Sequence, residues 1–130
     1  MLYKAEVLNE AALRHAQYYL SKLEKLRAIY QSTPDRAVPA LRKLIPQIQQ
    51  ARSWLLDNQH SSPSCPETLV KITAAGMGCV RMVVSPGEWE NWIQTGIDAA
   101  AETGAHVERL DFILEQGIQA FRQGDLENAR

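Results

Sequence analysis

The stretch LRHAQYYLSKLEKLRAIY, residues 13–30, decides the fold of this chain. Its apolar residues recur at steps of three and four, which places them on one face of a helix. They are Leu13, Ala16, Leu20, Leu23, Leu26 or Arg27, and Tyr30. Asn9 is a candidate N-cap, and a turn follows at Gln31-Ser32-Thr33-Pro34-Asp35. The pattern predicts one helix of about 22 residues between these two signals.

A second stretch with the same period runs from about residue 36 to residue 58. Its apolar face consists of Leu41, Leu44, Ile45, Ile48, Ala51 or Arg52, and Leu55. Pro39 falls near the start, where a missing N–H does little harm, whereas Pro46 should bend the helix or break it near Ile45. Because only a short turn joins the two helices, residues 1–57 are expected to form an antiparallel helical hairpin.

A linker and a third helix come next. Residues 58–66, NQHSSPSCP, are polar, contain two prolines and lack periodicity, which is typical of a linker. A helix is expected to open at Pro66 and Glu67, since proline suits a first turn and an acid suits the positive end of the helix dipole. Residues 80–84 also have strand propensity, but no second strand is evident to pair with them. We therefore expect a buried helix that packs closely through its glycines.

Two further helices complete the pattern. One begins at Trp89 and ends at Thr103, with Gly104 as the residue that follows its C-cap. The other begins near His106, and its apolar face consists of Leu110, Ile113, Leu114, Gly117, Ala120 and Phe121. It is expected to stop at Gln123-Gly124, where Asp125 caps a short last stretch. The sequence therefore predicts an all-α fold in a single domain of 130 residues.

The charges are balanced overall but not along the chain. Residues 1–57 carry nine Lys/Arg and five Asp/Glu, or +4, and residues 58–130 carry five and ten, or −5, which gives the net charge of −1. This balance argues against nucleic-acid binding through bulk charge. This uneven distribution of charge predicts two solvated helical faces of opposite sign. Alternatively, the two halves of the chain attract each other, or neighbouring copies stack head to tail. Neither a signal peptide nor a membrane span is apparent, so a cytoplasmic location is expected.

No motif in the sequence has the spacing of a catalytic or metal-binding site. The histidines show no metal-ligand spacing and the cysteines form no CxxC motif; they are His15, His60, His106, Cys65 and Cys79. Gly76-Met77-Gly78 lacks the third glycine and the preceding strand of a dinucleotide-binding turn. We therefore expect no catalytic residue, no metal, no cofactor and no enzymatic activity.

The last part of the chain resembles a tetratricopeptide unit. The ordered run is Gly117, Gly124, Asp125, Leu126 and Ala129, in which Gly124-Asp125 would form the turn between the two helices. Gly87 lies 37 residues before Gly124 in a related Gly-acid-apolar turn, against a family period near 34. The resemblance implies a degenerate repeat over residues 67–104 and an incomplete unit over residues 105–130. It also implies that antiparallel hairpins stack in a right-handed superhelix.

A second resemblance covers more of the chain. Arg14-His15-Ala16-Gln17-Tyr18-Tyr19-Leu20 is similar to a signature in the helical sensor regions of bacterial STAND-type signal-transduction ATPases, of the NB-ARC–tetratricopeptide kind. Ile48–Leu55 and Trp92–Gly104 are similar to later stretches of the same regions. The chain has no G-x-x-x-x-G-K-[ST] loop, so no nucleotide chemistry follows from this resemblance.

Together these features predict a non-catalytic helical-repeat module that binds a protein or peptide partner or senses a signal, as part of a larger regulatory protein. Candidate partner contacts are Tyr18, Tyr19, Trp89, Trp92, Glu108, Asp111 and Glu115. Trp89 and Trp92 could either pack in the core between two layers of helices or line a binding groove as aromatic anchors. Glu108, Asp111 and Glu115 could equally form an ordinary acidic face exposed to solvent. The alternative is a small free-standing protein that forms a homo-oligomer through the exposed face of its last repeat.

Overall fold

The computed structural model describes the backbone of residues 2–128 and the side chains of residues 9–124. Within residues 2–128 the chain forms helices and no strand, which confirms the all-α prediction. The helices are α1 (Leu2–Ser32), α2 (Pro34–Asp57), α3 (Ser64–Gly76), the 3-10 turn η1 (Val80–Met82), α4 (Pro86–Thr103) and α5 (His106–Asn128). None of them is long and apolar enough to cross a membrane.

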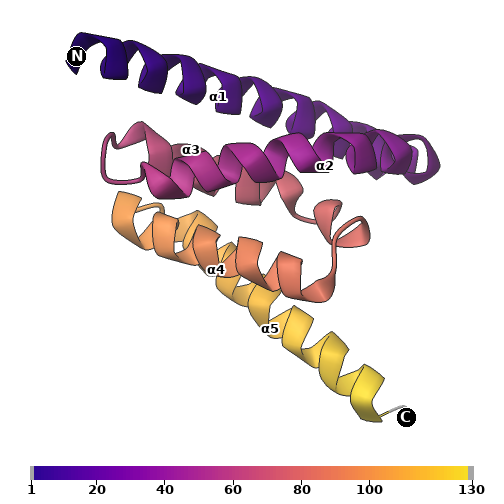
Figure 1. The fold of residues 1–130 in the computed structure, drawn as a ribbon. Coiled ribbons are helices and arrows are strands. Elements are labelled where there is room, and N and C mark those ends of the chain that lie inside the picture. Colours follow the sequence, from indigo (N-terminus) through magenta and orange to yellow (C-terminus); the bar gives the residue numbers. More distant parts are fainter. Residues whose placement is uncertain (1, 129–130) are drawn as a thin grey trace.

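Helices α1 and α2 lie side by side and run in opposite directions (Figure 1). Their facing stripes are buried as the periodicity predicts, and Leu23, Leu41 and Ile48 have no exposed surface. The predicted break near Pro46 does not occur, because α2 is one continuous helix. Pro39 and Pro46 are exposed and seven residues apart, which places both rings on the outer side of α2, away from its packed face.

Helix α3 lies at the centre and contacts α1, α2 and α4. It is shorter than predicted, because residues 80–84 form a 3-10 turn and a bend instead of more helix. The helix ends at Gly76, because the next residue, Met77, has an extended ψ of 126°, and Gly78 follows with a φ of +83°, a left-handed conformation that favours glycine. Gly76 approaches α4 closely: a Cβ there would lie 3.1 Å from Cζ3 of Trp92.

Helix α4 has the caps that its sequence specifies. The Ser85 hydroxyl accepts a hydrogen bond from the backbone N–H of Glu88 at 3.2 Å, and Pro86 occupies the first turn. Residues 85–88, expected as a turn, thus form the cap and first turn of α4. Gly104 ends the helix at a φ of +75°, as predicted.

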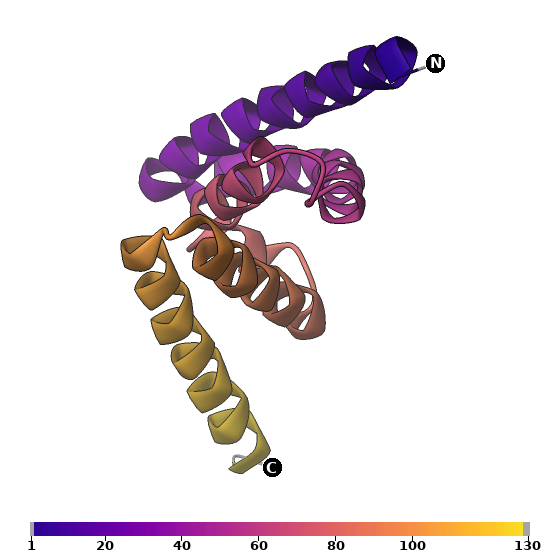
Figure 2. The ribbon, with the colours of Figure 1, turned by 90° about the vertical axis from the view of Figure 1, so that its left-hand side faces the viewer.

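Helix α5 forms the last layer, and its C-terminal half extends beyond the other helices (Figures 1 and 2). The predicted turn at Gly124-Asp125 is absent, since α5 continues through both residues to Asn128. One glycine costs a helix only about 1 kcal/mol, which its neighbours in the same helix can offset. The stacking of hairpins into a right-handed superhelix stays a prediction.

Candidate functional site

In the part of the chain whose side chains are described, no three His, Cys, Asp or Glu residues come close enough to share a metal ion. His15 lies against Tyr19, with ring centroids 4.8 Å apart. Cys65 and Cys79 are buried and unpaired, and burial raises the pKa of both thiols. A buried thiol with a raised pKa is a poor nucleophile, so these cysteines act as small core residues.

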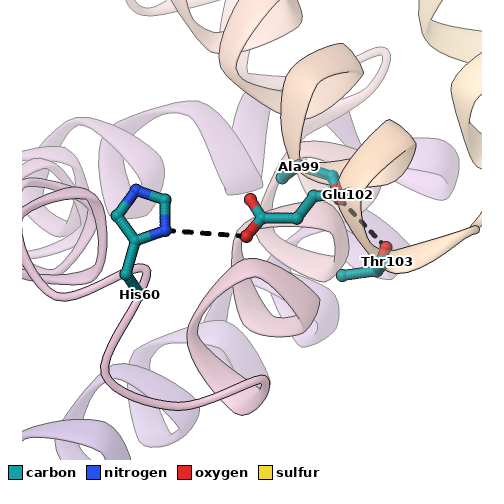
Figure 3. A network of polar contacts seen from close by, with 4 residues as sticks. All are labelled: His60, Ala99, Glu102 and Thr103. Carbon is teal, nitrogen blue, oxygen red and sulfur yellow. Dashed lines mark hydrogen bonds and ion pairs between the residues drawn. The ribbon is translucent and has the colours of Figure 1, made fainter.

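His60 contacts Glu102 across the end of the molecule where the α2–α3 loop meets the end of α4 (Figure 3). The His60 Nδ1 to Glu102 Oε1 distance is 3.8 Å, and the two side chains are 83% and 44% exposed. The neighbouring Thr103 hydroxyl is occupied, because it donates to the Ala99 carbonyl at 3.0 Å. A solvated pair of this kind contributes little to stability and supplies no organised acid–base chemistry.

Tyr18 and Tyr19 are neighbours on α1, where Tyr18 is exposed and Tyr19 packs partly against the core. Their rings are 5.4 Å apart, Tyr18 is 54% exposed and Tyr19 is half-buried. The ammonium group of Lys22 sits 4.8 Å from the Tyr18 ring centroid, and the interaction with Tyr18 raises the pKa of Lys22. The cation therefore stays charged at neutral pH beside an exposed aromatic ring.

A groove of about 470 Å³ runs beside these tyrosines, between α1 and α2. Three lysines surround an apolar floor, and no carboxylate lines the groove; its residues are Tyr19, Lys22, Lys25, Leu26, Ala40, Lys43, Leu44 and Gln47. This groove attracts acidic groups, but nothing in it fixes the orientation of a ligand. Unlike a small-molecule site, it has no convergent set of buried polar groups.

Trp89 and Trp92 are fully buried on α4, with ring centroids 5.9 Å apart. They therefore lie in the core and offer no surface to a partner. The Arg52 guanidinium of α2 stacks on Trp92 at 4.4 Å and donates hydrogen bonds to Gln49 and Asn91. Burial lowers the pKa of Arg52 to about 10, and neither of those hydrogen-bond partners is a carboxylate.

The three predicted acids of α5 follow each other at steps of three and four on one side of the helix, but they differ in burial. Glu115 is largely buried against α4 and accepts a hydrogen bond from Trp89 Nε1 at 3.3 Å, while Arg122 approaches it at 3.6 Å. Glu108 lies two turns before Glu115 on the same side of the helix and is half-buried. Asp111 is exposed at the edge of this side, next to the outward-facing residues. Glu115 thus links α5 to α4 through its hydrogen bond with Trp89, instead of facing a partner.

The most unusual surface of the molecule is the side of α5 that faces away from α4. Its large apolar side chains are exposed: Val107 70%, Leu110 66%, Ile113 40%, Leu114 65%, Ile118 39% and Phe121 69%. We call Val107, Leu110, Leu114, Gly117 and Phe121, which follow each other at steps of three and four, the outer seam of α5. Its flanks carry Ile113 and Ile118.

The side of α5 that contacts α4 is, by contrast, mostly polar. Its residues are Glu108, Phe112, Glu115, Gln119 and Arg122, of which Phe112 and Gln119 are buried. An ordinary surface helix buries its apolar face and exposes its polar one, so α5 is turned the opposite way. Periodicity located this apolar face, but only the packing shows that it points outward.

Comparison of the chain with protein families, curated proteins and solved structures found no match.

Proposed function

We propose that this chain is a non-catalytic helical module that works by binding another protein. The observation that carries the proposal is the outer seam of α5. Four of its side chains, Val107, Leu110, Leu114 and Phe121, are each 65–70% exposed on one helix face. Among the described residues, no group of three His, Cys, Asp or Glu that could hold a metal ion accompanies it.

The size of this apolar surface favours a macromolecular partner. The exposed fractions of the six large side chains of the seam and its flanks add up to about three and a half fully exposed residues. At roughly 150 Å² for each side chain, they present on the order of 500 Å² of apolar surface. That value lies at the upper end of what monomeric proteins expose, and such patches mark interaction sites.

The shape of the surface indicates what kind of protein structure it accepts. The seam is a straight ridge on one helix rather than a pocket, which suits a second amphipathic helix laid along it. The sequence resemblance to sensor regions of signal-transduction ATPases supports the same class of function, in which binding is passed on to a neighbouring domain.

Site-specific photo-crosslinking tests this proposal. A photoreactive amino acid at Leu114 should give discrete protein adducts in cells, because Leu114 lies in the middle of the seam. The same amino acid at Glu90, which is exposed on α4, is the matched control and should give none. Equal labelling at both positions, or no adduct at either, would refute a binding function for the seam.

A further inference from the structure

The outer seam has the geometry of one half of a helix pair. Val107, Leu110, Leu114, Gly117 and Phe121 keep the 3-4-3-4 spacing that lets two helices interlock side chains along a shared line. The seam lies opposite the face that contacts α4, and Figure 2 shows no other helix on that side of α5. A second helix can therefore reach the whole seam without meeting α4.

We propose that this second helix is α5 of another copy of the chain, and that the two α5 helices pack antiparallel along their outer seams. This inference rests on the proposed function, because it names the protein that the seam binds. The pairing places Leu114 against Gly117 of the other copy and Leu110 against Phe121. The two-fold axis then passes between residues 115 and 116.

The sizes of the seam residues favour this antiparallel pairing. A two-fold interface uses the same patch twice, so the patch must be complementary to itself. In the antiparallel pair each Leu114 fills the space that a Gly117 leaves open, where nothing lies within 4 Å of a Cβ placed on the glycine. In a parallel pair Gly117 would face Gly117 between two layers of large side chains, which would leave a cavity.

The area and the charges also fit a second copy. If the flanking Ile113 and Ile118 are buried with the seam, two copies of about 500 Å² each bury about 1,000 Å² together, the size at which specific interfaces begin. Among the carboxylates of α5 whose side chains the structure describes, Asp111 is the nearest to the seam, and in this pairing its two copies lie about 14 Å apart along the helix axis. The helix dipoles are opposed, and over the part of α5 whose side chains are described the pairing brings no two carboxylates into contact.

Light scattering on the purified chain gives the first test. The wild-type chain should have twice the chain mass of 14.6 kDa. Leu114→Glu places two carboxylates in the seam and should weaken the dimer at least about 100-fold, giving the monomer mass. Met82→Glu adds the same charge at another exposed apolar residue, 49% exposed and outside α5, and should stay dimeric.

Disulfide trapping tests the direction of the helices without relying on a disruptive variant. Leu110→Cys mixed with a tagged Phe121→Cys chain should give the mixed disulfide under mild oxidation. Leu110→Cys alone should give none, because its two copies lie about 16 Å apart along an antiparallel pair. The native Cys65 and Cys79 are buried, so the wild-type chain is the matched background.

The outcomes separate this inference from the proposed function. A monomeric wild-type chain, a dimeric Leu114→Glu variant, or a Leu110→Cys homodisulfide would each overturn the antiparallel pair. If the chain is monomeric while photo-crosslinking at Leu114 captures a different protein, the self-association is wrong and the binding function stands. If Leu114 gives no adduct at all, both are wrong.

Discussion

Replacing Gly96 with alanine should destabilise the fold, although alanine is the better helix former. Gly96 lies in the middle of α4, where it packs against α3. A Cβ on Gly96 would lie 2.6 Å from Cγ2 and 2.9 Å from Oγ1 of Thr73, which is fully buried. Threonine is stiff at χ1, and the Thr73 hydroxyl donates to the Leu69 carbonyl at 2.9 Å, so the side chain cannot rotate away without losing that bond.

The expected magnitude follows from two opposing effects. Alanine in a helix interior gains about 1 kcal/mol over glycine. Forcing a methyl group into a packed interface costs about 1–3 kcal/mol, and breaking the Thr73 hydrogen bond adds about 1 kcal/mol. We expect Gly96→Ala to lower the free energy of unfolding by about 1–3 kcal/mol, which corresponds to roughly 4–11 °C in Tm for a chain of this size.

Urea unfolding followed by circular dichroism, at one chain concentration for all variants, measures this effect. Gly87→Ala is the matched control in the same helix, since nothing lies within 4 Å of a Cβ there, and it should change stability by less than about 0.5 kcal/mol. Adding Thr73→Ser removes the Cγ2 contact and should recover at least about half of the loss, a coupling that a double-mutant cycle reports. A Gly96→Ala variant as stable as the wild type would refute the close α3–α4 packing.

Three other outcomes are expected from the same structure. Arg52→Met should change the free energy of unfolding by less than about 1 kcal/mol, because the buried cation has no carboxylate partner, whereas Arg52→Ala should cost about 2–3 kcal/mol in lost packing; urea unfolding compares them. Phe112→Ala should cost about 3–4 kcal/mol by the same assay. Leu110→Ala on the exposed seam, measured in the monomeric Leu114→Glu background, should cost less than about 0.5 kcal/mol. Cys65 and Cys79 should both resist a thiol reagent at pH 8 and react fully after unfolding, since burial raises the pKa of each thiol; fast labelling of the native chain would contradict their burial.

The candidate surfaces were predicted less well than the helices. Tyr18 was proposed as a contact and is exposed, but Trp89 and Trp92 share the same aromatic character and are fully buried. Their three-residue spacing puts both on one side of α4 without saying which neighbour covers that side. Arg52 occupies a position of the apolar stripe of α2, four residues after Ile48, and this spacing was the only sequence signal of its burial.

Periodicity alone determined that this chain is all helical and placed the start of α5 and the end of α4, because helix pitch and caps depend on neighbouring residues. It also located the apolar side of α5. The tertiary structure decided where that side points: contact of Phe112 and Glu115 with the core turns the outer seam to solvent. A helix carries its amphipathic pattern within its own sequence, but the surface that it meets belongs to residues far away in the chain.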